Sequence, residues 1–188
     1  MNSLIKNGWP MCLALMTMAS LLALAQDRTL AQDCRQTLPV SAPDQRYTQN
    51  ADGTVTARVT GLIWKQCPEG LSGADCGAGN GQLPEDSTLL TWQAALQHAA
   101  AADFAGSRDW RLPDLKELHS LIDLQCGTPA LNSHLFPKTP GLSASEFWTS
   151  SPHPSPATDA YAVDFSEGYV TIAPKELTAY VRLVRDAD

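Results

Sequence analysis

The chain has 188 residues, of which 44% are hydrophobic and 18% charged, and its formal net charge is −7 at pH 7. This length suits one ordinary domain with a leader, and the composition excludes an intrinsically disordered chain. The acidic charge repels nucleic acid and anionic lipid surfaces at long range, which argues against a nucleic-acid-binding protein.

The first 25 residues have the composition of a secretory signal peptide. Lys6 is their only charged residue, and residues 10–25 are almost entirely apolar. The small residues Ala23 and Ala25 are typical of a cleavage site. An N-terminal membrane anchor is the alternative, but the apolar run is shorter than the ~20 residues that a span needs. We therefore predict cleavage near Ala25, with Ala31 as the second choice, export to the periplasm or the extracellular space, and no membrane span in the mature chain.

Four cysteines remain after this cleavage: Cys34, Cys67, Cys76 and Cys126. An even number of cysteines in an exported chain indicates two disulfides, and four cysteines allow three pairings. A proline and two glycines between Cys67 and Cys76 let that segment fold back on itself, which favours Cys67–Cys76 and by exclusion Cys34–Cys126. The alternative is a four-thiolate zinc site, for which the chain lacks a C-x-x-C pair.

The predicted elements begin with an extended arm over residues 26–45. Asp52-Gly53 is a turn dipeptide between strand-forming residues at 46–48 and 54–56, and so predicts a hairpin. Residues 62–64 follow as a buried strand. The segment from Cys67 to Thr88 is rich in Gly, Asp, Pro and Ser and is predicted to be a long surface loop.

Two helices are predicted in the middle of the chain. Thr91 is placed to cap a helix from Trp92 to about Ala102, whose apolar residues recur at helical spacing. Asp114 is placed to cap a second helix, and Glu117 three residues later completes a capping-box pattern.

An irregular stretch is predicted over residues 127–145, and the rest of the chain is predicted to form strands. A strand over 147–149 is followed by a hairpin, with strands at 160–165 and 169–172 around a turn at 166–168. A final strand over 179–185 closes the chain. Strands at both ends with two helices between them predict an α+β domain.

The order of these pieces resembles the Lcl C-terminal domain family, a former domain of unknown function named after a bacterial collagen-like adhesin. The resemblance rests on short collinear matches that cover about residues 46–185. They are Arg46-Tyr47, Asp52-Gly53-Thr54-Val55, Thr60-Gly61-Leu62-Ile63-Trp64, Thr91-Trp92, Ala95-Leu96, Asp109-Trp110-Arg111-Leu112-Pro113, Lys116-Glu117-Leu118, Pro129-Ala130-Leu131-Asn132, Phe136-Pro137, Phe147-Trp148-Thr149-Ser150-Ser151, Val163-Asp164-Phe165, Gly168 and Tyr180-Val181-Arg182-Leu183-Val184-Arg185.

This resemblance implies an exported bacterial protein whose family domain spans residues 46–186. It also implies a fold similar to C-type lectins, with two helices packed on a twisted, mostly antiparallel sheet and long loops at one end. The adhesin that named the family is associated with binding sulfated polysaccharides. Here there is no Gly-X-Y tract, and the net charge of −8 without residues 1–25 opposes attraction to anionic chains.

Arg111 raises two hypotheses, because it lies between Trp110 and Leu112 just before the second helix. It is either an active-site arginine or a structural strut that connects the loop before this helix to the sheet. A buried guanidinium must be paired, and Glu117 and Asp164 are plausible partners, with Asp109 as another. No nucleophile lies nearby in the sequence, so we favour the structural strut.

No cofactor, metal site or catalytic residue is predicted. The four histidines are scattered without an H-x-x-x-H pattern, and no G-x-S-x-G motif occurs. A calcium site needs six to eight converging oxygens, whereas the acidic loop residues are spread out. Most tryptophans stand in apolar, periodic settings that indicate core packing rather than sugar stacking.

We therefore expect an exported, non-catalytic binding module that recognises a glycan or another envelope or extracellular protein. The candidate surface is the loop Pro68–Thr88 together with Ser151–Asp159. A cell-envelope enzyme with an unrecognised site and a structural envelope protein without a small ligand are the alternatives.

Overall fold

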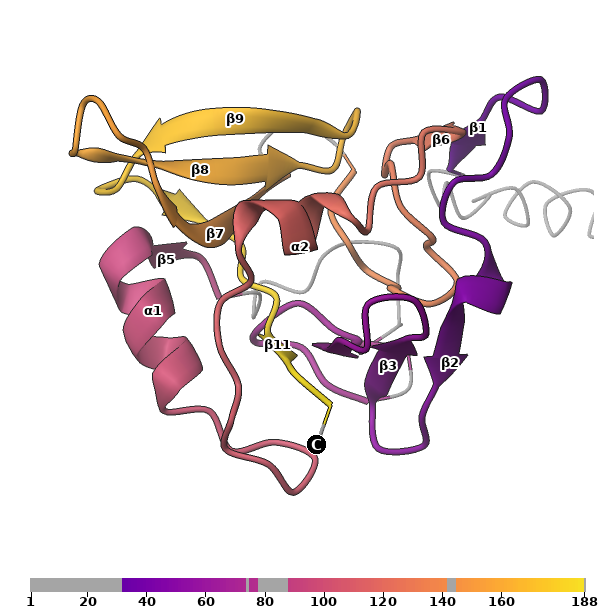
Figure 1. Cartoon of the computed structure of the whole chain (residues 1–188), viewed down its shortest axis with the longest axis horizontal. Coiled ribbons are helices and arrows are strands. Elements are labelled where there is room, and N and C mark those ends of the chain that lie inside the picture. The colour runs from indigo at the N-terminus through magenta and orange to yellow at the C-terminus, as the bar shows by residue number, and fades with distance from the viewer. Residues whose placement is uncertain (1–31, 74, 78–87, 142–144, 188) are drawn as a thin grey trace, which may run out of the picture.

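The computed structural model describes residues 32–187 except residues 74, 78–87 and 142–144. The predicted signal peptide and the first part of the predicted arm lie outside the described residues. Within these residues the chain forms two α-helices and several small antiparallel sheets, which confirms the α+β class (Figure 1). The likeness to C-type lectins stays a prediction. Neither helix in the described part has the length and apolar character needed to cross a membrane.

The elements are short and follow one another closely. In chain order they are β1 (Asp33–Cys34), the 3-10 helix η1 (Asp44–Arg46), β2 (Tyr47–Gln49), β3 (Thr54–Ala57), β4 (Ile63–Lys65), β5 (Leu90–Thr91), α1 (Trp92–Ala100), α2 (Leu115–His119), β6 (Cys126–Gly127), β7 (Glu146–Pro152), β8 (Asp159–Asp164), β9 (Tyr169–Pro174), β10 (Thr178–Ala179) and β11 (Val184–Arg185).

One sheet joins the start of the domain to its end, in the order β11-β4-β3-β2. The predicted hairpin forms its β2–β3 edge, with Tyr47 opposite Ala57. Gly53 occupies the turn at φ +82°, a backbone conformation that residues other than glycine rarely adopt. A Cβ atom there would also lie 3.2 Å from the Phe104 ring, so the turn and the segment after α1 are in close contact.

The second main sheet has the order β7-β8-β9, and the two helices pack on its opposite faces. Phe147 and Val163 are register partners in β7 and β8 and belong to the core that contains Leu118 of α2. The next pair, Trp148 and Ala162, belongs to the core that contains α1. The period of two along a strand therefore divides the interior into two cores.

The predicted final strand over residues 179–185 is wrong as a single element. β10 pairs with β5, Tyr180 bridges to Phe147 of β7, and β11 pairs with β4. The segment thus passes from one sheet to the other, so its residues cannot all pair with one neighbouring strand. Its irregular middle is nevertheless buried, and it connects the two sheets.

Both predicted helix starts are confirmed. The Thr91 hydroxyl accepts from the backbone N–H of Ala94, and Asp114 and Glu117 form a complete capping box. The first helix is slightly shorter than predicted, because it ends at Ala100.

Three of the tryptophans are core residues, as predicted. Trp64 and Trp148 are fully buried and Trp110 is nearly so. Trp92 is only partly buried, and its indole N–H donates to the carbonyl of Thr149 at 2.8 Å.

Candidate functional site

Both disulfides join the pairs that the sequence favours. Cys34–Cys126 links the neighbouring strands β1 and β6 and spans 92 residues of sequence. Cys67–Cys76 spans 9 residues and closes a small loop after β4, where the two sulfur-bearing residues pack with buried Leu71. The first bridge ties the N-terminal arm to the body of the domain, and the second shapes a loop.

Arg111 forms a two-pronged ion pair with Glu117. Its guanidinium nitrogens lie 2.7 and 2.8 Å from the two carboxylate oxygens, and a third contact reaches Asp186 at 3.2 Å. Its backbone exchanges two hydrogen bonds with Val184, at 2.9 and 3.0 Å. Arg111 thus connects the loop before α2 to β11, but its side chain is 38% exposed rather than buried.

The expected partnership between Arg111 and Asp164 is not found. Asp164 lies at the end of β8, where its carboxylate accepts the backbone N–H of Ser166 at 2.6 Å and stabilises the turn before β9. The reason is topological: Arg111 bridges to the β11-β4 sheet, whereas Asp164 belongs to the β7-β8-β9 sheet.

The pair between Arg111 and Glu117 makes a testable contribution to stability. The hydrogen bond from Arg111 lowers the pKa of Glu117, against the opposing effect of burial. The pKa of Glu117 is lower in the folded protein than in the unfolded chain. The pair therefore stabilises the fold fully at pH values above the pKa of Glu117 in the unfolded chain, and this stabilisation is lost as the pH falls through its pKa in the folded protein. We expect Arg111→Ala to cost about 1 kcal/mol near neutral pH, a value limited by solvent screening, and to cost less in acid.

Urea unfolding of wild type and variant at neutral and acidic pH measures this difference. Arg108→Ala is the matched control, because the ion pair of Arg108 with Asp103 is highly exposed and should contribute little. A loss that stays constant down to pH values at which Glu117 is protonated would contradict the pairing.

The deeply buried arginine is Arg182, which the sequence analysis did not single out. Its guanidinium is fully buried, and it donates to the carbonyls of Lys65 and Gln66 and to the hydroxyl of Thr139. It also lies over the ring of Phe136 at 5.0 Å. Desolvation lowers the pKa of Arg182, and attraction by Glu69 partly opposes this effect. Its place within the apolar run of residues 180–184 is the signal that could have revealed it.

A pocket of about 330 Å³ lies between the β2–β3 turn and the loop closed by Cys67–Cys76. Three short segments within residues 49–73 form its walls, together with the ring of the more distant Phe104. The lining residues are Gln49, Asn50, Ala51, Asp52, Gly53, Lys65, Gln66, Cys67, Leu71, Ser72, Gly73 and Phe104. Amide, carboxylate and hydroxyl groups thus meet an apolar side made by Leu71 and Phe104.

Hydrogen bonds hold the turn that forms one wall of this pocket. One carboxylate oxygen of Asp52 accepts from both the backbone N–H and the hydroxyl of Thr54, at 3.0 and 2.7 Å. The Asn50 amide donates to the hydroxyls of Thr54 and Thr56 at 2.8 and 2.9 Å. The backbone N–H of Gln66 donates to the carbonyl of Gly53 at 3.0 Å, so the turn is fixed to the opposite wall.

A chain of ionisable groups runs from the pocket towards α1. The Lys65 ammonium lies 2.7 Å from one oxygen of the buried Glu69 carboxylate, and His98 Nε2 lies 2.6 Å from the other. The ammonium also lies 4.7 Å from the centre of the Phe104 ring. Because Glu69 compensates its charge, Lys65 does not make the pocket a strong site for anions.

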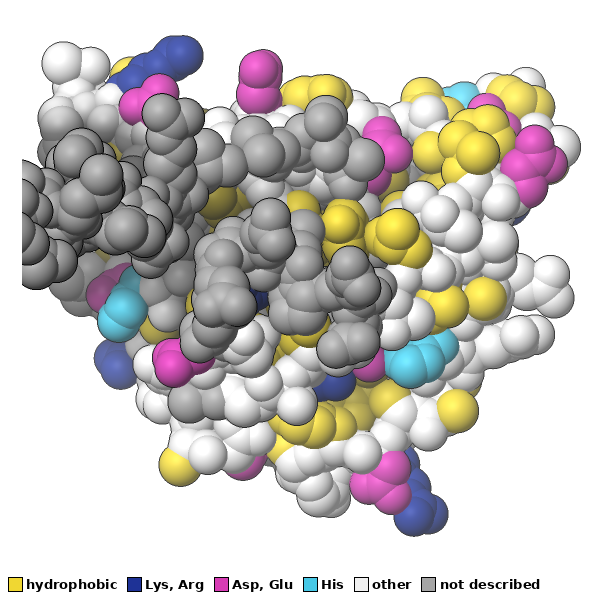
Figure 2. Space-filling model, turned by 180° about the vertical axis from the view of Figure 1, so that it is seen from behind, with side chains coloured by type: hydrophobic (Ala, Val, Ile, Leu, Met, Phe, Trp, Pro, Cys, Tyr) yellow, Lys and Arg dark blue, Asp and Glu magenta, His cyan; other side chains and the backbone are white. Residues whose placement is uncertain are grey.

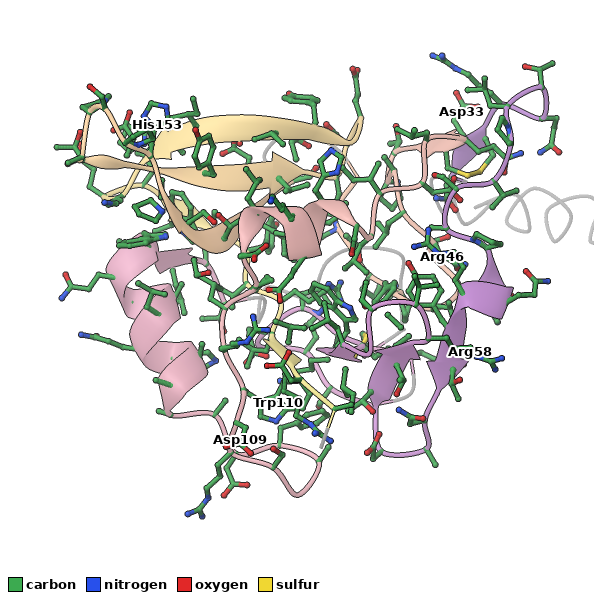
Figure 3. The ribbon with its side chains drawn as sticks, in the orientation of Figure 1. Asp33, Arg46, Arg58, Asp109, Trp110 and His153 are labelled. Carbon is green, nitrogen blue, oxygen red and sulfur yellow. A yellow bond between two sulfur atoms is a disulfide. The ribbon has the colours of Figure 1, made fainter. Side chains whose placement is uncertain are left out.

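The two loops proposed as one recognition surface are not brought together in the described residues. Leu71, Ser72 and Gly73 of the first loop line the pocket, but no residue of Ser151–Asp159 does. Figure 3 places His153 of the second loop near the start of β8, far from Trp110, whose ring contacts the pocket residue Phe104. The candidate surface therefore reduces to the pocket with its adjoining loop.

Sequence reasoning missed the pocket because its walls come from separate segments. Asp52-Gly53 predicts a turn, which is its structural role, and Phe104 follows α1 without a recognisable motif. No group of three or more His, Cys, Asp or Glu side chains that could hold a metal ion occurs in the described part of the chain. On the face seen in Figure 2, the coloured lysine and arginine side chains are few and separated, which gives no basic surface for nucleic acid.

A family model matches most of this chain. No curated protein matches the chain. The family model described as the Lcl C-terminal domain matches residues 53–185, which include the pocket-forming turn from Gly53, both helices and every strand from β3 to β11. Two disulfides are typical of proteins that fold in an oxidising compartment, and with the family they indicate an extracellular or periplasmic location. The chain belongs to the Lcl C-terminal domain family.

Proposed function

We propose that this protein is an exported, non-catalytic binding module that recognises an uncharged glycan in the pocket between the β2–β3 turn and the Cys67–Cys76 loop. The observation that carries the proposal is the pocket itself, with its volume of about 330 Å³ and its mixed polar and apolar lining. This volume is within the range of small-molecule binding sites.

The chemistry of the lining suits sugar hydroxyl groups. Asn50, Asp52 and Gln49 carry amide or carboxylate groups at one wall, and Ser72 adds a hydroxyl at the other. The Gln49 amide and the Ser72 hydroxyl can both donate and accept hydrogen bonds, and the carboxylate of Asp52 and the amide oxygen of Asn50 can accept them, as sugar hydroxyls require. Leu71 and Phe104 offer an apolar surface for the C–H faces of a sugar ring. The fixed turn favours binding, since a preformed site avoids the entropy cost of ordering.

The charge distribution favours an uncharged glycan over a sulfated one. The whole chain is acidic, with 20 Asp and Glu against 13 Lys and Arg. Lys65, the one cationic residue among the lining residues described, is neutralised by Glu69 at 2.7 Å. An anionic polysaccharide would therefore meet long-range repulsion without a local compensating charge.

A glycan array with purified exported protein tests this function, and parallel arrays with and without EDTA test for a metal. The informative variant is Ala51→Trp, which adds a large side chain at the pocket wall and removes no described hydrogen bond. We expect it to reduce glycan binding at least about tenfold, as blocking a contact worth about 1.4 kcal/mol would.

Ala100→Trp is the matched control, because Ala100 is exposed at the end of α1 and does not line the pocket. It should bind like wild type. Absence of any glycan binding, or equal binding by both variants, would contradict the proposal. Mass spectrometry of the bound glycan after long incubation tests the non-catalytic part, since a cleaved product would identify an enzyme.

We propose that a signal peptide directs export of the chain and is cleaved near Ala25. The mass of the mature protein would establish the new N-terminus, and a product that retains residues 1–25 would support the membrane-anchor alternative.

A further inference from the structure

The pocket wall that contains Asn50 and Asp52 is held by hydrogen bonds whose directions are fixed. The Thr54 hydroxyl lies 2.7 Å from Asp52 Oδ1, and an ionised carboxylate only accepts, so this hydroxyl donates its single proton there. The Thr54 oxygen can therefore only accept at its other contact, which is the Asn50 amide at 2.8 Å. An amide donates only through its nitrogen, so Asn50 Nδ2 must face Thr54.

These bonds use up every side-chain donor of the two residues. Asn50 Nδ2 also donates to the Thr56 hydroxyl at 2.9 Å, so both of its protons are engaged. Asp52 Oδ1 also accepts the backbone N–H of Thr54, at 3.0 Å. Each side chain is left with one oxygen, Asn50 Oδ1 and Asp52 Oδ2, that accepts no hydrogen bond from a described residue. The two side chains thus offer the pocket acceptors and no donors.

The two remaining oxygens are close enough to serve one sugar unit. Asn50 Nδ2 and Asp52 Oδ1 both contact the same Thr54 oxygen, so the amide and the carboxylate lie next to each other. Both residues line the pocket, and Asp52 is exposed in the turn of the β2–β3 hairpin (Figure 1). A ligand can therefore reach this acceptor pair from solvent.

An acceptor pair selects its ligand by the protons that the ligand can donate. A free sugar hydroxyl has one proton to donate and suits either oxygen. The ether or ester oxygen of an O-methylated or O-acylated sugar has none and would leave the acceptor unpaired. A site built to bind a hydroxyl rejects an analogue that lacks it for this reason. Lys65, a donor elsewhere in the lining, is held by Glu69 at 2.7 Å and leaves this wall unchanged.

We propose that Asp52 and Asn50 determine the specificity of the pocket, and that its ligand is an uncharged glycan whose hydroxyl groups are unsubstituted where they meet this wall. The inference rests on the proposed function, because it requires a glycan in this pocket, and it adds the class of glycan: free hydroxyls are accepted, whereas O-methylated and O-acylated sugars are rejected. Thr54 and Thr56 are positioning residues, because they act through these two side chains.

Two arrays test this specificity: one of uncharged oligosaccharides, and a duplicate of the same sugars with every hydroxyl O-methylated. Wild type is expected to bind a free sugar with a Kd at least about fivefold lower than that of its O-methylated form, as the loss of one hydrogen bond predicts. No binding of any sugar on either array would overturn the proposed function and this inference with it. Equal binding of both forms would leave the proposed function intact and overturn this inference alone.

Asp52→Asn separates hydrogen bonding from the added bulk of the methyl groups. The new amide oxygen must take the place of Oδ1, because the N–H and the hydroxyl of Thr54 both donate to that position. The amide nitrogen then replaces the remaining oxygen and turns an acceptor into a donor. Asn-Gly also suits a hairpin turn. The preference for free over O-methylated sugar should fall by about fivefold, because a methylated oxygen can accept from the new donor.

Asp109→Asn is the matched control, because it removes the same charge from an exposed aspartate that does not line the pocket. Its preference for free sugar should equal that of wild type. This preference is a ratio of two Kd values for the same protein, so partial unfolding of a variant cancels out of it. A preference that stays unchanged in Asp52→Asn, or falls equally in both variants, would overturn the proposal.

Discussion

Replacing Arg182 with alanine is expected to lower the free energy of unfolding by about 3–5 kcal/mol. The buried guanidinium donates to the carbonyls of Lys65 and Gln66 and to the Thr139 hydroxyl. Alanine would leave these acceptors without a donor in the interior and would open a cavity beside them. Urea unfolding near neutral pH, followed by tryptophan fluorescence, measures the loss.

Two comparisons make this result specific to Arg182. Arg182→Met should cost less than Arg182→Ala, because methionine refills the space beside Phe136 and Phe147 while the acceptors stay unpaired. Arg111→Ala should cost only about 1 kcal/mol, because that side chain is partly exposed. Equal losses for the alanine variants of the two arginines would contradict the assignment of Arg182 as the central buried cation.

Arg182 also contributes to the shape of the pocket. Its two carbonyl acceptors belong to Lys65 and Gln66, and both residues line the pocket wall at the end of β4. Desolvation lowers the pKa of Arg182, and Glu69, which also neutralises Lys65, partly opposes this effect by electrostatic attraction. The buried cation and the pocket therefore share one short segment of chain, and disruption of the first should disturb the second.

Local signals in the sequence predicted the local structure well. The caps at Thr91 and Asp114, the turn at Asp52-Gly53 and the hairpin before β9 each depend on a few neighbouring residues, and all of them are present in the structure. The short disulfide could be anticipated for the same reason, since the glycines and proline between Cys67 and Cys76 allow a tight loop.

Interactions between distant segments were harder to predict. Arg111 and Arg182 both lie between apolar residues in the sequence, yet only Arg182 is buried, because residues 180–184 pass between the two sheets. The same passage breaks the predicted final strand into β10 and β11. Nothing in the sequence near Phe104 indicates that its ring approaches Gly53, and so the pocket could not be located from the sequence.

Removing the Cys34–Cys126 disulfide is expected to cost about 4–5 kcal/mol, more than removing Cys67–Cys76, at about 2–3 kcal/mol. The reason is chain entropy: the first bridge spans 92 residues and the second 9, so the first restricts the unfolded chain much more. Both cysteines of a pair are replaced by serine, which avoids a free thiol, and urea unfolding of the oxidised proteins gives the two losses.

Removing each disulfide in turn should affect stability and glycan binding in opposite orders. Cys67 lines the pocket and its bridge shapes the wall that contains Leu71, Ser72 and Gly73. Losing this short bridge should therefore weaken glycan binding strongly at a modest cost in stability. Losing Cys34–Cys126, which joins β1 to β6 outside the pocket, should leave the binding of the folded protein near that of wild type. If the short bridge proves more important for stability and irrelevant for binding, the pocket is not where the ligand binds.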